Sequence, residues 1–301
     1  MMVEVPLPPG IERRSIDTRR GPVAALHAKP ERAIGRTSVM VCGFMGTKED
    51  FWHLLPLLAQ AGYDAWSYDH AGQHGGEFTG PQGDGPERYM TQSMAEEGRE
   101  VVEAVGAGAS VHVVGHCFGG FVARAMALAA PSLTRTLSLL SCGPNVRSAH
   151  ARAMVAGIDD LIDRGGAMLM WPLLKRVLHN EDQVTRDFWH ANLATVNPNY
   201  LKGVARSLAD EKADLSGEVA AAGIRSLVMH GSREKRLWRP EAYAEMARVL
   251  RADLVVVDKA GHNVYRDQPE VTAANLLAFW ARAEAAAAVV RVRDGVRAGA
   301  S

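Results

Sequence analysis

One stretch decides the fold of this chain: Gly115-His116-Cys117-Phe118-Gly119-Gly120. It joins a short apolar run, Val111 to Val114, to a segment with apolar residues at helical spacing, Phe118 to Ala130. A sharp strand-to-helix turn strains its central residue, and flanking glycines remove side chains that would clash there. The pattern predicts that Cys117 stands at a helix N-terminus, where the dipole and unpaired N–H groups favour a thiolate. The alternative, a buried cysteine that only fits a tight turn, leaves the flanking strand and helix patterns unexplained.

The segments on both sides of this turn alternate between strand and helix patterns. Apolar runs predict strands at 11–18, 23–28, 38–42, 63–68, 111–114, 136–140, 226–229 and 254–257. Apolar residues at helical spacing predict helices at 50–61, 94–105, 118–130, 240–250 and 269–288. Because strands that alternate with helices form parallel sheets covered on both faces, we predict an α/β fold with a mostly parallel central sheet.

The region 143–222 interrupts this alternation between two predicted strands. Its pattern is helical, and it is rich in large apolar residues. We expect an inserted helical cap here, on a core made of 1–142 and 223–288. The Ala-, Arg- and Val-rich residues 289–301 are expected to form a C-terminal tail. The other interpretation of the apolar residues in 143–222 is additional packing of the core.

Composition excludes several classes of function. Lys plus Arg and Asp plus Glu both number 34, so the sequence has no basic excess to attract nucleic acid or an anionic membrane. It contains no run of 18 apolar residues and no N-terminal signal-peptide pattern. Three cysteines, an odd count, are typical of free thiols in a reducing compartment. We therefore expect a cytoplasmic protein that acts on a small molecule, without a nucleic-acid or membrane partner.

The turn around Cys117 resembles the nucleophile elbow of the α/β-hydrolase fold family, with cysteine in place of the usual serine. Elbows of this kind occur in dienelactone-hydrolase-like and thioesterase-like members. The segment Val41-Cys42-Gly43-Phe44-Met45-Gly46 resembles the family's oxyanion loop, with Cys42 where relatives often have histidine. The resemblance implies that the backbone N–H groups of Phe44 and Phe118 form the oxyanion hole.

Two further segments resemble the parts of this family that hold the catalytic base and acid. Ala260-Gly261-His262 follows the last predicted strand, where the fold places its catalytic histidine. The segment from His230 follows the preceding strand and puts Glu234 at the acid position, with Asp258 as the rival acid. The resemblance implies a catalytic set of Cys117, Glu234 and His262, with no metal ion or other cofactor.

A cysteine nucleophile favours activated acyl groups such as thioesters, lactones and activated esters. We expect acyl transfer to water or an alcohol through an S-acyl intermediate on Cys117, as in a hydrolase or an acyltransferase. Dienelactone-hydrolase-like proteins, polyhydroxyalkanoate synthases and thioesterases are each similar in part, and the sequence does not choose among them. The substrate would be a small acyl compound, free or as a carrier-bound thioester. The alternative is a non-hydrolytic member of the fold: a lyase, a cyclase or a ligand-binding protein.

Large apolar side chains near the expected site indicate an apolar acyl pocket. The candidate lining residues are Met45, Met168, Trp171 and Trp189.

Overall fold

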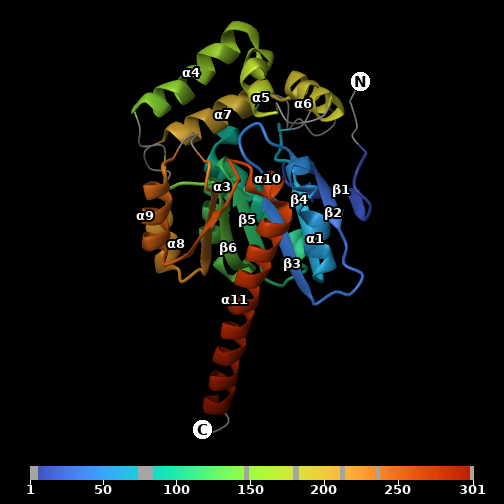
Figure 1. The fold of residues 1–301 in the computed structure, drawn as a ribbon, viewed down its shortest axis with the longest axis vertical. Coiled ribbons are helices and arrows are strands. Elements are labelled where there is room, and N and C mark those ends of the chain that lie inside the picture. The colour runs from blue at the N-terminus through green and yellow to red at the C-terminus, as the bar shows by residue number, and fades with distance from the viewer. Residues whose placement is uncertain are drawn as a thin grey trace.

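An eight-stranded sheet forms the centre of the computed structural model, which describes residues 6–73, 84–145, 149–178, 183–210, 214–234 and 238–298. The strands are β1 Ile11–Thr18, β2 Gly21–Ala28, β3 Arg36–Val41, β4 Tyr63–Tyr68, β5 Val111–His116, β6 Thr134–Leu140, β7 Ser226–Gly231 and β8 Asp253–Val257. Their order is β1-β2-β4-β3-β5-β6-β7-β8 (Figure 1). The β1–β2 and β2–β4 pairs are antiparallel and all other pairs are parallel, which confirms the predicted fold class.

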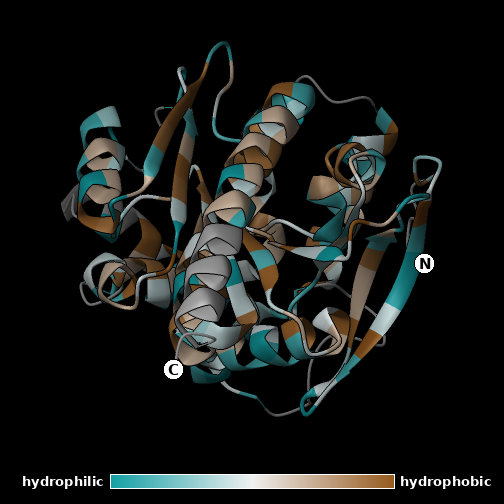
Figure 2. Ribbon diagram, turned by 90° about the horizontal axis from the view of Figure 1, so that it is seen from below, coloured by the Kyte–Doolittle hydropathy of each residue, from teal (hydrophilic) through white to brown (hydrophobic). Residues whose placement is uncertain are grey.

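Helices cover both faces of this sheet, as Figure 2 shows from below. On one face lie α1 Leu55–Gln60, α10 Val264–Asp267 and α11 Pro269–Ala298. On the other lie α2 Thr91–Gly106, α3 Phe118–Ala129, α8 Ser216–Ala221 and α9 Pro240–Leu250. Each face has its own cluster of buried apolar side chains. Because both faces are covered, central strands such as β5 are buried along their whole length.

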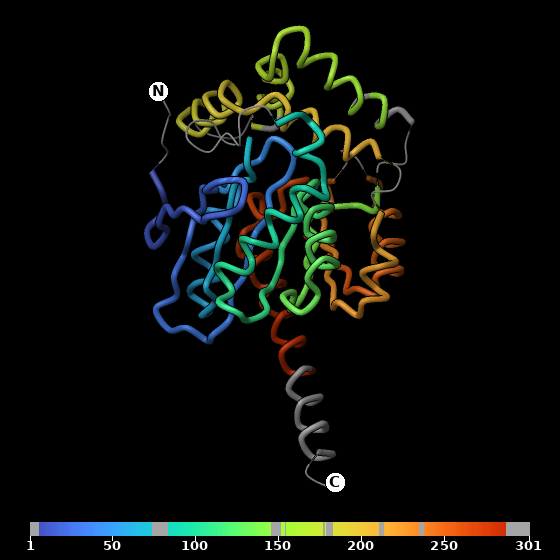
Figure 3. The backbone as a smooth tube through the Cα atoms, turned by 180° about the vertical axis from the view of Figure 1, so that it is seen from behind, coloured from blue at the N-terminus to red at the C-terminus, as the bar shows by residue number. Residues whose placement is uncertain are grey.

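Four helices form a cap across one edge of the sheet (Figures 1 and 3). They are α4 Ala149–Gly165, α5 Trp171–Val177, α6 Gln183–Thr195 and α7 Pro198–Ala209. The chain leaves the sheet after β6 and returns before β7, so the cap lies over the carboxyl ends of the parallel strands. Close packing of α7 on the short core helix η2 Pro86–Tyr89 anchors this layer. A Cβ on Gly203 of α7 would lie 2.3 Å from the Pro86 carbonyl oxygen.

The segment before β7 departs from the expected cap boundary. α8 lies within the range 143–222, yet it packs against the core helices α3 and α9. Arg124 on α3 explains this placement, because its buried guanidinium donates to the Ser216 hydroxyl at the start of α8 (3.1 Å). The same group lies 3.4 Å from Asp214. By its packing, α8 therefore belongs to the core, and the cap consists of α4 to α7.

α11 reaches well beyond the sheet and ends at the far side from the cap (Figure 1). It runs without a break to Ala298, so residues 289–298, expected as a tail, are helical. Its first part packs on the sheet through Leu276 and Trp280, both fully buried. None of the helices in the described ranges combines the length and apolar character needed to cross a membrane.

Candidate active site

Cys117 occupies the sharp turn between β5 and α3. Its backbone has a φ of 49° and a ψ of −117°, a positive φ that residues other than glycine rarely adopt. Two backbone hydrogen bonds hold the turn. The Cys117 N–H donates to the Leu140 carbonyl oxygen (2.9 Å), and the Gly120 N–H donates to the Cys117 carbonyl oxygen (3.0 Å). The strained residue is thus fixed from both sides.

Two glycines make this turn possible. A Cβ on Gly115 would lie 2.4 Å from the Gly119 carbonyl oxygen, and a Cβ on Gly119 would lie 2.2 Å from the Val41 carbonyl oxygen. Because these oxygens belong to the backbone of packed elements, they cannot move aside as a flexible side chain would. The glycines therefore let α3 begin in direct contact with β3 and β5.

His262 and Glu234 meet beside Cys117 from two different loops, after β8 and β7 respectively. Glu234 Oε2 lies 2.5 Å from His262 Nδ1, and both side chains are buried. His262 forms a side-chain hydrogen bond with Cys117 and lines the same cavity. Asp258, the rival acid, instead accepts a hydrogen bond from the Ser232 hydroxyl at the protein surface (3.4 Å). The acid in contact with His262 is therefore Glu234.

The surroundings of His262 favour its protonated form. Burial by itself lowers the pKa of a histidine. The charge of Cys117 and the hydrogen bond to it, together with the Glu234 carboxylate, outweigh burial and raise the pKa of His262 to about 9. The ring is therefore protonated at neutral pH and can donate a proton to a reacting atom.

The loop after β3 touches the nucleophile turn. A Cβ on Gly43 would lie 3.1 Å from the Cβ of Cys117. Phe44 follows Gly43, and the loop closes with a hydrogen bond from the Gly46 N–H to the Gly43 carbonyl oxygen (3.0 Å). Phe118 begins α3, where the first N–H groups of a helix have no partner within it. The Phe44 N–H thus belongs to the loop that touches Cys117, and the Phe118 N–H belongs to the residue that follows Cys117 in the chain.

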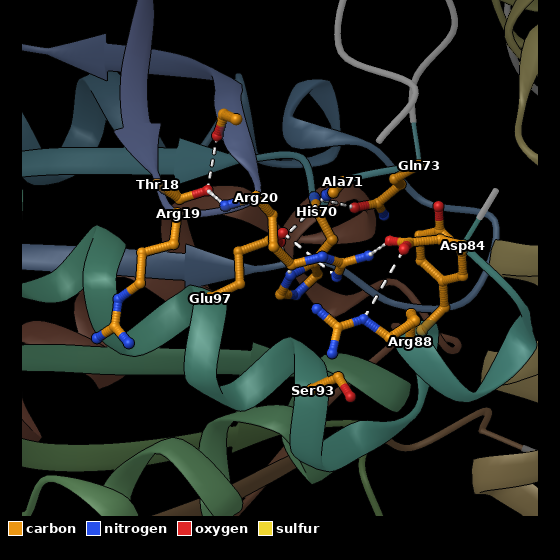
Figure 4. A network of polar contacts seen from close by, with 12 residues as sticks. Thr18, Arg19, Arg20, His70, Ala71, Gln73, Asp84, Arg88, Ser93 and Glu97 are labelled. Atoms are coloured by element: carbon orange, nitrogen blue, oxygen red, sulfur yellow. Dashed lines mark hydrogen bonds and ion pairs between the residues drawn. The ribbon is translucent and has the colours of Figure 1, made fainter. Parts of the chain in front are cut away.

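A chain of polar contacts leads from the β1–β2 hairpin to Gln73 (Figure 4), and Gln73 in turn contacts this loop. Arg20 in the hairpin lies 3.6 Å from Glu97 of α2, and Glu97 Oε1 lies 2.9 Å from His70 Nδ1. The His70 N–H donates to the side-chain oxygen of Gln73 (2.8 Å). The Gln73 amide nitrogen in turn donates to the Gly46 carbonyl oxygen (2.6 Å). Buried Gln73 therefore ties the turn after β4 to the oxyanion loop.

The other two cysteines are buried on opposite sides of the sheet. Cys42 belongs to the apolar cluster with α1 and α11, and Cys142 to the cluster with α2 and α3. Burial raises the pKa of Cys42 well above its usual range and the pKa of Cys142 to about 12. Both are therefore neutral thiols at physiological pH, and all three cysteines are free. Each thiol also has a buried polar partner: Cys42 Sγ accepts from the Gln73 amide nitrogen (2.9 Å), and Cys142 Sγ accepts from Arg124 Nη2 (3.8 Å).

A cavity of about 690 Å³ lies between the cap and the edge of the sheet. Cys117 and His262 line its core side. Most of the cap side is apolar and includes Val155, Ile158, Leu161, Met170, Leu174 and Trp189. A cavity of this size and character accommodates a small organic molecule with an apolar portion.

Two of the four residues predicted for the pocket, Met45 and Trp189, line this cavity. The other two, Met168 and Trp171, are not part of its lining. Trp171 packs edge-on against His190 of α6, with 4.7 Å between ring centroids. Met168 and Trp171, predicted as pocket residues, therefore lie outside the lining of this cavity.

A polar group on the core side of the cavity was not predicted from the sequence. Asp50, Asn263 and Arg266 line it there. Arg266 Nη2 lies 2.7 Å from Asp50 Oδ1 although the two residues are 216 positions apart. No local sequence pattern reveals a pair so far apart in the chain. The sequence indicated only that each of the two residues follows a segment assigned to the site. In the described parts of the chain, no three His, Cys, Asp or Glu side chains are grouped as metal ligands.

The sequence of this chain also resembles known proteins. Residues 39–275 match the model of a family described as the alpha/beta hydrolase family. Among curated proteins, the chain is 32% identical over 106 residues to RutD of Azorhizobium caulinodans, which is named for a carbamate hydrolase activity. This match covers 35% of the chain and 37% of the relative.

Solved structures share the fold at low sequence identity. An esterase from Thermogutta terrifontis superposes with a TM-score of 0.72 at 18% identity, over 90% of this chain and 99% of that one. A thioesterase domain from the curacin biosynthetic pathway superposes with a TM-score of 0.67 at 15% identity, over 89% of this chain and 99% of that one. At these sequence identities, the similarity to both structures shows a shared fold.

Proposed function

The chain belongs to the alpha/beta hydrolase family, and we propose that it transfers acyl groups from thioesters, lactones or activated esters through an S-acyl intermediate on Cys117. Water is the simplest acceptor, which makes the activity a hydrolysis; an alcohol in its place makes it an acyl transfer. The names of the relatives, which include an esterase, a thioesterase and a carbamate hydrolase, support acyl chemistry at this site.

The observation that carries this proposal is the meeting of three side chains at one cavity. Cys117 stands in the strained turn, His262 forms a hydrogen bond with it, and Glu234 contacts His262 at 2.5 Å. The acid orients the imidazole through Nδ1, which directs Nε2 to the nucleophile. A protonated histidine beside a cysteine favours the thiolate, which is the reactive form.

Acylation begins when the Cys117 sulfur attacks the acyl carbon and forms a C–S bond. The carbonyl electrons move to the oxygen, and the N–H groups of Phe44 and Phe118 stabilise the oxyanion. When the carbonyl re-forms, the bond to the leaving group breaks, and the leaving atom takes the proton from His262.

Deacylation reverses these roles. His262, now neutral, accepts a proton from water or an alcohol as its oxygen attacks the S-acyl carbon. The oxyanion forms again at the same two N–H groups. Its collapse breaks the C–S bond, releases the acid or ester, and restores the thiolate with a protonated His262.

A trapping experiment tests this proposal. The purified protein is incubated with a panel of p-nitrophenyl esters, acyl thioesters and lactones, and its intact mass is measured at short times. We expect an added acyl mass on the wild type and on Cys142→Ala, and none on Cys117→Ala. Turnover of any substrate by Cys117→Ala at the wild-type rate contradicts a covalent mechanism at Cys117. Absence of both adduct and turnover across the panel favours a non-hydrolytic role.

A further inference from the structure

The catalytic cavity has two chemically different sides. The cap side is mostly apolar, with Arg176 of α5 as its charged residue, whereas the core side carries a polar wall formed by Asp50, Asn263 and Arg266. Asn263 and Arg266 follow His262 within the same short segment, and Asp50 belongs to the 3-10 helix η1 Lys48–Phe51 after the oxyanion loop. The polar wall is therefore built from the two segments that flank the reacting atoms.

An ion pair lies at the centre of the polar wall. Arg266 Nη2 is 2.7 Å from Asp50 Oδ1, with side chains 16% and 6% exposed. The Arg266 guanidinium also lies over the ring of Trp189, 5.7 Å from its centroid, so a cap side chain helps to hold it. A Cβ on Gly46 would lie 2.3 Å from Asp50 Oδ2, which places the carboxylate against the oxyanion loop. The pair is therefore fixed within reach of the catalytic centre.

Such a pair presents acceptor and donor groups side by side. A carboxylate has about four acceptor positions and a guanidinium has five N–H donors, so an intact pair can bind a third polar group. Burial raises the pKa of Asp50 to about 6, against the opposing charge of Arg266, and the carboxylate is charged at neutral pH. The matching ligand offers both a donor and an acceptor, as the N–H and C=O of a secondary amide do.

The proposed reaction determines which part of the substrate lies beside the polar wall. His262 delivers its proton to the leaving atom, so the leaving group must lie on the His262 side of Cys117. The apolar cap side is left for the acyl chain. The leaving group therefore passes along the polar wall.

Resting on the proposed function, we infer that the polar wall selects substrates by the leaving group: a thiol or alcohol with a secondary amide a few atoms from the scissile bond. The Asp50 carboxylate accepts from the amide N–H, and the Arg266 guanidinium donates to the amide oxygen. Acyl thioesters of amide-containing thiols and acyl esters of amide-containing alcohols belong to this class.

Matched thioesters test the polar wall. Hexanoyl N-acetylcysteamine and S-pentyl hexanethioate share the acyl group and the length of the leaving group, but only the first contains an amide. The measured quantity is the ratio of their kcat/KM values. Because intrinsic thiol reactivity is constant across variants, changes in this ratio report recognition of the amide.

We expect Arg266→Met to lower this ratio about tenfold or more, as loss of a hydrogen bond to a charged group does. Asp50→Asn, which keeps the shape of the side chain, should lower it in the same direction. Arg176→Met is the matched control, because Arg176 lines the same cavity from α5; there the ratio should stay at the wild-type value even if both rates change.

Two results would overturn the inference, and they are distinct. If the wild type turns over both thioesters but Arg266→Met and Asp50→Asn keep its ratio, the ion pair is only a structural tie between α10 and η1. If the wild type turns over neither thioester and forms no adduct, the proposed function itself fails.

Discussion

In the proposed mechanism, the protonation of His262 governs how the site responds to pH. Its pKa of about 9 predicts that kcat/KM falls as pH rises through 9, because the proton for the leaving group is then lost. Glu234→Gln removes one of the causes of the raised pKa, so the alkaline limb should move to lower pH. A pH–rate profile of both proteins with one thioester measures this shift.

The same shift in pKa has a consequence for stability. The folded state binds the His262 proton more tightly than the unfolded chain, whose histidine titrates near 6.5. Its stabilising contribution is therefore complete below pH 6.5 and is lost as pH rises to about 9.

Asp258→Asn is the control for Glu234→Gln in the pH–rate profile, since Asp258 contacts Ser232 instead of His262. If Asp258→Asn moved the alkaline limb and Glu234→Gln did not, Glu234 would not be the partner of His262.

Some residues of the candidate site could be predicted from the sequence, and others could not. Cys117, Glu234 and His262 were predictable as candidates, because each follows a strand at the point where the resembled fold puts a functional loop. The ion pair of Asp50 and Arg266 was not, since its members come from distant segments and only the closed sheet brings them together. Contacts of that kind depend on tertiary structure, which no local pattern encodes.

At the level of elements, the turn that joins β5 to α3 around Cys117 has no room for a side chain at position 119. Gly119→Ala should unfold the protein or lower its stability by more than about 3 kcal/mol, because the new Cβ would meet backbone rather than a mobile side chain. Gly157→Ala is the matched control: it lies in α4 with open space around it. That variant should gain about 1 kcal/mol from better helix propensity. Urea unfolding measures both, and equal effects would contradict the packing argument.

Gln73 couples two elements of the site. Gln73→Leu should leave the Gly46 carbonyl and the His70 N–H without this partner and cost about 2 kcal/mol or more in stability. Because the oxyanion loop then shifts, kcat should fall about tenfold with little change in KM. Gln183→Leu, at an exposed position of α6, is the control. A change in KM alone would show that Gln73 affects binding and not the oxyanion hole.

Whole elements were predicted well where the pattern was periodic and less well at boundaries. The strands and the helices of the core follow from buried apolar runs. The end of the cap does not, because α8 has the same helical pattern as its neighbours and is drawn to the core by buried Arg124. Which layer a short helix joins depends on a partner far away in the chain.

At the scale of the whole molecule, the proposed reaction makes the cavity between cap and core the limit on the size of the acyl group. Leu161→Trp on α4 fills part of it, so activity should fall more for long-chain than for short-chain p-nitrophenyl esters. Val184→Trp, on an exposed position of the cap outside the cavity lining, should leave the chain-length profile unchanged. Equal loss for every chain length in Leu161→Trp would place the acyl group elsewhere.

The insertion of the cap between β6 and β7 also determines when the enzyme can first become active during synthesis. Cys117 and the oxyanion loop precede the cap in the chain, whereas Glu234 and His262 follow it. A ribosome that adds about 5 to 20 residues per second therefore makes the proposed nucleophile, Cys117, roughly 7 to 30 s before the proposed base, His262. Until β7 and β8 join the sheet, the nascent chain carries a cysteine without its acid–base partners. Catalytic activity of this protein thus reports that the last two strands have been made and have docked.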